Sequence, residues 1–194
     1  MTHVIIGAMD GVSYDDIFDR LGEDDVALFI EPIPYQFDKL KENVKKLRCQ
    51  VLLDNSAISD RKEDLVMAYV PPKYLKNHED FIRGCSSVVK FNKPLNRYLA
   101  EIDESNLEYH ETKAISFDTI MDKWGLDKVD YVQVDCEGYD QKIVDSIDLI
   151  KYNIKTLKFE IHYVNLDFIN YFSQKWPQYK PTIKGADIIY EYTF

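Results

Sequence analysis

Short strand-like segments that alternate with helix signals constrain the fold of this chain more than any other feature. Five segments rich in apolar residues lie at 3–6, 26–30, 51–53, 129–135 and 156–162. Such runs are typical of strands in a buried parallel sheet. Helix signals separate the first of them: Ser13 can cap a helix, Gly22 can end it, and Pro34 suits the first turn of the next. This alternation predicts an α/β fold with a mainly parallel sheet and helices on both faces.

Two helices and a hairpin are predicted in the C-terminal half. Asp118 can cap a helix that Gly125 ends, and another helix follows Gly138. The apolar residues of that last helix recur at helical spacing and are expected to face inward: Ile143, Val144, Ile147 and Ile150. Residues 188–192 pair with 182–183 in a closing antiparallel hairpin, which brings the predicted sheet to seven strands.

The regular alternation stops between about residues 71 and 114. This stretch contains Pro71, Pro72 and Pro94, scattered charges and no clear period. We interpret it as an insertion, or lid, that covers the functional site. The remainder is long enough for one substantial core but short for two, so a single domain over residues 1–194 is expected.

Composition excludes several classes of function. The formal net charge is -10, which makes long-range association with nucleic acid phosphates unfavourable. No run reaches the roughly 18 apolar residues that span a bilayer, and the first strand follows Met1 without a signal peptide. The three cysteines lack Cys-x-x-Cys spacing and predict neither a disulfide framework nor a zinc site. We expect a cytoplasmic protein with no membrane span and no nucleic acid partner.

Small and polar residues lie at the carboxyl ends of the predicted strands, where open α/β sheets bind their ligands. The turn at 7–11 follows the first strand, and Glu31 follows the second. The turn's glycines let backbone N–H groups approach a ligand, and Glu31 can accept the hydroxyls of a ribose. Together they indicate a nucleoside cofactor. A simple tight connection and a solvated helix-entry acid are the structural alternatives for these two features.

The turn favours adenosylmethionine over a nicotinamide cofactor. A dinucleotide fingerprint needs three glycines as Gly-x-Gly-x-x-Gly, whereas this turn has only Gly7 and Gly11. Asp10 lies between them and would repel a pyrophosphate. Adenosylmethionine has no phosphate and carries a sulfonium and an ammonium group, which an acidic turn suits.

The chain resembles the FkbM family of methyltransferases. The matching segments, in order, are IGAMDGV at 6–12, FIEP at 29–32, NSAISD at 55–60, ISFDTI at 115–120 and VDYVQVDCEG at 129–138. The most specific of these is Asp135-x-Glu137-Gly138 with Glu31-Pro32 upstream. Two positions depart from the family pattern: Ile5 stands where the family often has an acid, and Gln133 stands where it often has a lysine.

The resemblance implies a Rossmann-like class I methyltransferase fold, adenosylmethionine as methyl donor, and hydroxyl groups, often on sugars, as acceptors. By position, Gly7, Asp10 and Gly11 would face the methionine and ribose portions, Glu31 the ribose hydroxyls, and Ala57 with its neighbours the adenine. The cofactor-binding residues predicted on this basis are Gly7, Ala8, Asp10, Gly11, Glu31, Pro32, Ser56, Ala57 and Asp135.

Methyl transfer to a hydroxyl needs a group that aligns the acceptor oxygen and removes its proton. Residues two apart on a strand share a face, so Glu160 and His162 should be neighbours, as should Asp135 and Glu137. The predicted catalytic residues are His162, Asp135 and Glu137. A metal-assisted alternative uses Asp135, Glu160 and His162 as ligands for Mg or Mn, which the resemblance makes plausible. The structural alternatives are a packing role for His162 and a helix-capping role for Asp135.

Competing functions remain open at this point. The chain could be a noncatalytic nucleotide or glycan binding module, or one domain of a larger glycan-building protein. It could also methylate a non-sugar small molecule. Amine methylation is disfavoured, because the Asn/Asp-Pro-Pro-aromatic turn that commonly serves it is replaced here by Asp135-Cys136-Glu137-Gly138.

Overall fold

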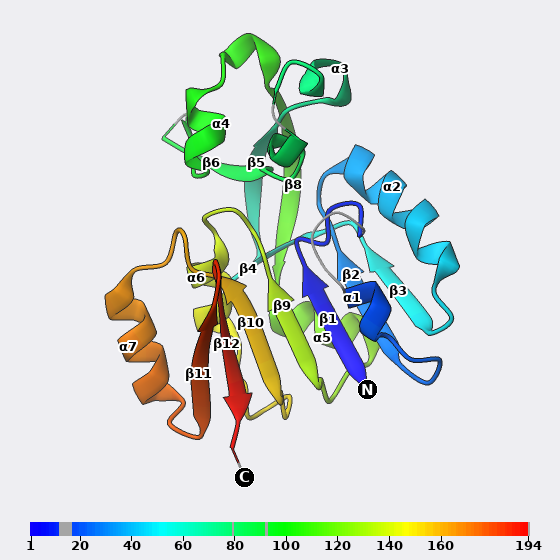
Figure 1. Cartoon of the computed structure of the whole chain (residues 1–194), viewed down its shortest axis with the longest axis vertical. Helices are drawn as coiled ribbons and strands as arrows, with labels where there is room; N and C mark the ends of the chain where they lie inside the picture. The colour runs from blue at the N-terminus through cyan, green and yellow to red at the C-terminus, as the bar shows by residue number, and fades with distance from the viewer. Residues whose placement is uncertain (12–16, 79, 92, 194) are drawn as a thin grey trace.

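A seven-stranded sheet forms the centre of the computed structural model, which describes residues 1–11, 17–78, 80–91 and 93–193. Its strand order is β11-β12-β10-β9-β1-β2-β3 (Figure 1). The strands are β1 (Thr2–Ile6), β2 (Val26–Ile30), β3 (Gln50–Asp54), β9 (Tyr131–Val134), β10 (Thr156–Glu160), β11 (Tyr179–Lys184) and β12 (Asp187–Tyr192). All neighbouring pairs from β3 to β10 are parallel, and β12 is antiparallel to both of its neighbours. The mainly parallel seven-stranded sheet with a closing hairpin is therefore confirmed.

The closing hairpin pairs the two segments that the sequence predicts. Thr182 pairs with Ile189, and Ile183 pairs with Ile188. Chain order runs outward from β1 to β3 on one side, and from β9 to β10 on the other. The direction of winding therefore reverses between β1 and β9, which is where ligands bind in open α/β sheets.

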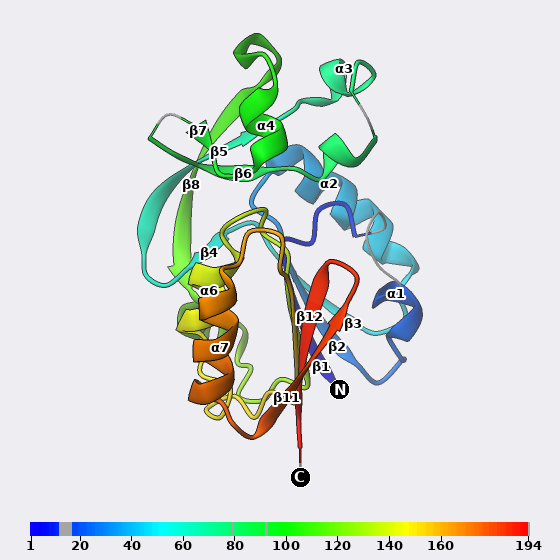
Figure 2. The same ribbon diagram turned by 60° about the vertical axis from the view of Figure 1, so that its left-hand side comes forward.

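Helices cover both faces of the sheet (Figure 2). One face carries α1 (Ile17–Arg20), α2 (Pro34–Asn43) and the 3-10 turn η1 (Val44–Lys46); the other carries α5 (Phe117–Trp124), α6 (Asp140–Ser146) and α7 (Leu166–Lys175). Strand alternation separates the two cores, because Ile5 and Phe29 pack with the first set while Ile6 packs with the second. Each fully buried side chain of this kind contributes about 1.5 to 3 kcal/mol.

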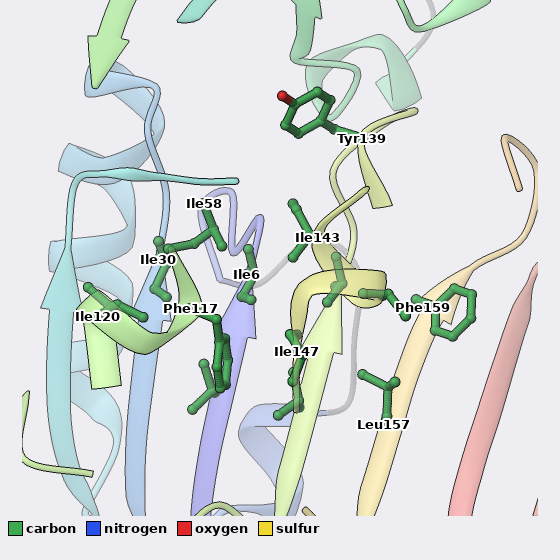
Figure 3. Close-up of a cluster of buried hydrophobic side chains, with 14 of the residues drawn as sticks. Ile6, Ile30, Ile58, Phe117, Ile120, Tyr139, Ile143, Ile147, Leu157 and Phe159 are labelled. Atoms are coloured by element: carbon green, nitrogen blue, oxygen red, sulfur yellow. The ribbon is translucent and has the colours of Figure 1, made fainter. Parts of the chain in front are cut away.

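The larger core lies between the sheet and helices α5 and α6. Ile6, Ile143 and Phe159 are among the side chains that meet there (Figure 3). Tyr139 lies at the upper end of the cluster with its hydroxyl directed away from the apolar side chains. That hydroxyl donates to Oε1 of Glu63 at 2.8 Å. The core therefore ends at a polar contact with the next layer of the molecule.

A second sheet lies beyond the carboxyl ends of the central strands (Figure 1). Its order is β4-β8-β5-β6-β7, with strands β4 (Ala57–Ser59), β5 (Glu63–Tyr69), β6 (Ser87–Lys90), β7 (Lys93–Pro94) and β8 (Glu108–Ser116). The short helical segments attached to it are α3 (Pro72–Leu75), η2 (Asp80–Arg83), α4 (Arg97–Glu101) and η3 (Glu104–Asn106). The stretch at 71–114, which shows no period in sequence, thus contains regular elements.

Several local expectations need correction. Ser116, not Asp118, caps α5 by accepting from the Thr119 N–H at 3.1 Å, and Asp118 instead accepts from the Tyr152 hydroxyl at 2.6 Å. Gly125 ends this helix in the left-handed conformation, as predicted. Ile150 is 51% exposed, because it follows the end of α6 and does not share its inward face.

Boundaries and one helix also differ from the sequence interpretation. Strands β9 and β10 end at Val134 and Glu160, one and two residues before the predicted ends. Helix α7 was not predicted from the sequence, although Asn165 caps it by accepting from the Asp167 N–H at 2.8 Å. The predicted cap at Ser13 lies outside the described residues.

Candidate active site

The backbones of two loops touch at the point where the winding of the sheet reverses. Gly7, directly after β1, has φ of +80°, and a Cβ placed on it would lie 1.8 Å from the carbonyl oxygen of Asp135. Only glycine permits this approach, since it has no Cβ and tolerates positive φ. The first glycine of the turn therefore brings the ends of β1 and β9 together.

The second glycine of the turn has a packing role. Gly11 has φ of +77°, and a Cβ there would lie 2.6 Å from the Phe18 ring and 2.7 Å from Leu40. A side chain at this position would displace the Phe18 or Leu40 side chain. Gly11 therefore fixes the path of the turn against the helices on one face of the sheet.

A cleft opens above this junction, between the central sheet and the second sheet. The central sheet contributes three carboxyl groups to its wall, from Glu31, Asp135 and Glu137. The other lining residues are Gly7, Met9, Pro32, Gln36, Met67, Gly84, Ser86 and Cys136. No lysine or arginine lines it within the part of the chain that the structure describes. The cleft is therefore acidic on the side of the central strand ends.

An apolar cavity adjoins the cleft and shares Gly7, Pro32, Met67 and Cys136 with it. Two further predicted cofactor residues line this cavity, Ser56 and Ala57. Its remaining walls are Ile6, Ile30, Ile58, Leu65, Val88, Tyr139 and Ile143. The structure thus brings the ends of β1 and β2 and the start of β4 around one continuous region.

The other predicted cofactor-binding residues of the turn at 7–11 do not line the cleft or the apolar cavity. Ala8 and Gly11 line a small cavity with Asp135 and Gln133. Asp10 is buried but is not among the residues that line these cavities. Its carboxylate lies 3.8 Å from Nη1 of Arg83, and its backbone carbonyl accepts from Nδ2 of Asn43 at 2.8 Å. Asp10 therefore faces the second sheet and α2.

Glu31 is the most constrained of the predicted cofactor residues. Its Oε2 accepts from the Met9 N–H and its Oε1 from the Ile33 N–H, each at 2.8 Å. Burial raises the pKa of this carboxyl to about 7, although the two backbone N–H donors oppose the rise. Glu31 therefore joins the turn after β1 to the start of α2, and it titrates near neutral pH.

The carboxyl groups after β9 form an acidic cluster. Burial, and then neighbouring carboxylates, raise the pKa of Glu137 to about 8, with Glu160 the largest charge contribution. Burial also raises the pKa of Asp140 to about 7, against backbone N–H donors. The pKa of Asp135 lies well above its usual range, because the group is desolvated and close to Asp140 and Glu137. The cluster therefore retains protons near neutral pH.

Sequence reasoning missed Asp140. Its Oδ1 accepts from the Cys136 N–H at 2.9 Å, and its Oδ2 accepts from the Gly138 N–H at 3.1 Å. Asp140 therefore holds the turn at the start of α6. The sequence alone suggests such a capping role for Asp135 instead. The available signal was the acid itself, at the first position of the helix that follows Gly138.

His162 and Glu160 are neighbours, as expected, although β10 ends before His162. Nδ1 of His162 lies 2.7 Å from Oε1 of Glu160, and the His162 side chain is 56% exposed. Neither residue lines the cleft. Asp135 and Glu137 do line it, but Glu137 has φ of +51°, so strand geometry does not continue to it.

The predicted metal ligands do not form a ready coordination set. In the ranges 1–11, 17–78, 80–91 and 93–193, no three His, Cys, Asp or Glu side chains are grouped so that they could hold a metal ion. The predicted ligands Asp135, Glu160 and His162 therefore do not form such a group. The use of Mg or Mn remains a prediction.

Comparison with known protein families identifies the chain. Residues 6–184 match the methyltransferase FkbM domain. The chain belongs to the FkbM methyltransferase family. Membership implies adenosylmethionine as cofactor and confirms the resemblance seen in the sequence motifs.

A solved structure agrees with the fold of this FkbM methyltransferase. The crystal structure of a methyltransferase from Geobacter sulfurreducens superposes with a TM-score of 0.53 over 99% of this chain and 71% of that chain, at 11% sequence identity. At that identity the likeness shows the fold alone. No curated protein matches the chain. Across the described ranges, no helix is long and apolar enough to cross a membrane.

Proposed function

We propose that the protein transfers the methyl group of adenosylmethionine to a hydroxyl oxygen of a sugar in a glycan or glycoconjugate. The observation that carries this proposal is the convergence of Glu31, Asp135 and Glu137 on one cleft at the reversal point of the sheet. A cleft with three carboxyl groups suits a cofactor with sulfonium and ammonium groups, because a bound cation favours the ionised carboxylates, whereas a pyrophosphate would oppose their ionisation.

The cofactor would lie across the junction of β1 and β9. Glu31 would accept the ribose hydroxyls with the lone pairs that its two backbone donors leave unused. The apolar cavity beside Ser56 and Ala57 would receive the adenine, whose flat faces suit apolar walls. Asp135 would lie near the positively charged methionine portion, because it lines the cleft next to Gly7.

Bound adenosylmethionine supplies an electrophilic methyl carbon on sulfur. The acceptor oxygen forms a bond to that carbon as the carbon–sulfur bond breaks, and the hydroxyl proton must go to a base. Glu137 is the proposed base: it lines the cleft, and its pKa of about 8 is close to working pH. His162 is the other candidate, but its exposed position outside the cleft wall favours Glu137.

The acidic cluster also bears on the acceptor. An anionic phosphate or carboxylate brought close to the base would oppose the ionisation of Asp135, Glu137 and Asp140 that a base requires, whereas a neutral sugar hydroxyl does not. A neutral portion of a glycan therefore suits the reacting position. Hydroxyl acceptors on sugars are also what the family resemblance implies.

Mass spectrometry with a labelled cofactor tests the proposal. A panel of neutral glycans is incubated with the protein and trideuteromethyl-labelled adenosylmethionine, and products are searched for the labelled methyl group. Labelled glycan is expected with the wild type and not with Glu137→Gln, which keeps the shape of the side chain but cannot take a proton.

Cofactor binding provides the second part of the test. Calorimetry should give tighter binding of adenosylmethionine and its demethylated product than of NAD. Tighter NAD binding would refute the cofactor assignment. Cofactor binding without labelling of any glycan would point to a non-sugar small molecule or to a noncatalytic module.

A further inference from the structure

The second sheet contacts the turn after β9 through two buried polar side chains. Ser87 begins β6 and Asn96 precedes α4, and both side chains are fully buried. The Ser87 hydroxyl donates to the backbone carbonyl of Glu137 at 2.8 Å. The same hydroxyl accepts from the Asn96 N–H at 2.9 Å. A chain of hydrogen bonds therefore runs from the second sheet into the candidate active site.

The side chain of Asn96 continues this chain to the carboxylate itself. Its Oδ1 accepts from the N–H groups of Tyr98 and Leu99, at 2.8 and 3.1 Å, and so caps α4. These two donors fix which end of the amide is oxygen, because only oxygen can accept them. The Nδ2 group must then face the opposite way, and it donates to Oε2 of Glu137.

We propose that Asn96 is a positioning residue that holds the Glu137 carboxylate in the cleft and ties its orientation to the second sheet. The inference rests on the proposed function, because Glu137 is the proposed base there. Asn96 acts through Glu137 and does not line the cleft. Loss of the amide removes this protein donor, and water that reaches Glu137 through the cleft would not tie the orientation of the carboxylate to the second sheet.

This link gives the second sheet a role in catalysis that its sequence does not reveal. Met67, Gly84 and Ser86 form the wall of the cleft opposite the central strands. Asn96 and Ser87, on the same sheet and its connections, hold the base. The position of the cleft wall and the orientation of the base are therefore set by one structural unit.

Two substitutions of Asn96 separate its cap from its amide donor. Asn96→Ser keeps a side-chain oxygen that can cap α4, but it is too short to reach Glu137 and adds no charge. Asn96→Asp also keeps the cap but removes the amide donor, so that a hydrogen bond between the two side chains survives only while one of the two carboxyl groups is protonated. Asn165→Asp is the matched control, since Asn165 caps α7 by accepting from the Asp167 N–H and is not part of the cleft.

The reciprocal exchange is Asn96→Asp with Glu137→Gln. It rebuilds the hydrogen bond with donor and acceptor reversed, because the glutamine amide can donate to the new carboxylate. If Asn96 positions residue 137, this pair should recover the order of the turn that Asn96→Asp loses. Methyl transfer should stay absent, because glutamine is not a base.

Amide hydrogen exchange and kinetics are the readouts, on the full chain with adenosylmethionine present. Asn96→Ser and Asn96→Asp should accelerate exchange in the peptide spanning residues 136–139 several-fold, and Asn165→Asp should not. Transfer of the labelled methyl group from trideuteromethyl-labelled adenosylmethionine to the panel of neutral glycans should fall on the order of 10- to 100-fold, with KM for adenosylmethionine within about 3-fold of wild type. The reciprocal pair should return exchange to the wild-type rate.

Three results would overturn the inference. Unchanged exchange and turnover in Asn96→Ser would show that the Asn96 amide does not position the Glu137 carboxylate. Equal effects from Asn165→Asp would show a general response to altered helix caps. Failure of the reciprocal pair to restore protection would leave Asn96 with its capping role alone. Should the wild type methylate no acceptor, the proposed function fails, and the exchange comparison still decides whether Asn96 holds residue 137.

Discussion

Replacement of Glu31 by glutamine should change how the stability of the fold depends on pH. Glu31 is buried and its pKa is raised from 4.5 to about 7, chiefly by desolvation. A carboxyl group with a raised pKa binds its proton more tightly in the folded state than in the unfolded state. Its contribution to stability is therefore fully present below pH 4.5 and is lost as pH rises to about 7.

The size of this loss follows from the pKa difference. A rise from 4.5 to about 7 corresponds to about 3 kcal/mol of unfolding free energy. Glutamine does not ionise, so Glu31→Gln should lack this part of the pH dependence. At low pH the variant should be the less stable protein, because each Glu31 oxygen accepts from one N–H group, whereas the glutamine amide has a single acceptor oxygen and turns its NH2 group toward the other N–H.

Urea denaturation of both proteins between pH 4.5 and 8 measures this difference without cofactor. The other raised carboxyl groups, such as Glu137, are present in both proteins and cancel in the comparison. The gap between Glu31→Gln and wild type should grow by about 3 kcal/mol in favour of the variant as pH rises. Parallel stability curves would refute the claim that Glu31 is a desolvated carboxyl with a raised pKa.

Three further outcomes are expected. Gly7→Ala should destabilise the fold by about 3 kcal/mol or more in urea denaturation, because its Cβ would collide with the Asp135 carbonyl; a loss below about 1 kcal/mol would contradict that approach. Ile143→Ala should cost about 2 to 5 kcal/mol, and Ile150→Ala, at an exposed position, much less; similar losses would contradict the assigned inward face of α6. Chelation should leave methyl transfer intact if Glu137 acts alone as base, whereas loss of activity that Mg or Mn restores would support the metal-assisted alternative.

Much of the central sheet could be predicted from the sequence because its signals are local. Apolar runs and glycine or proline boundaries indicate β1, β2 and the start of α2. Parallel strands place their carboxyl ends on one edge, so Gly7, Glu31 and Asp135 could be expected to converge. The pairing of the two hairpin segments could also be expected, because they are neighbours in the chain.

The second sheet and the finer geometry of the site were decided by tertiary structure. Strand β5 pairs with β8 across the whole intervening segment, so Glu63 meets Ala114, and no local period indicates that partnership. Asn96 reaches Glu137 over 41 positions of sequence. The raised pKa of Glu137 arises only when folding removes water from several carboxyl groups at once. Sequence alone determined which residues follow the strand ends, because periodicity and turn chemistry are local. Only the fold decided which of those residues are buried together, because burial and charge depend on neighbours that are distant in the chain.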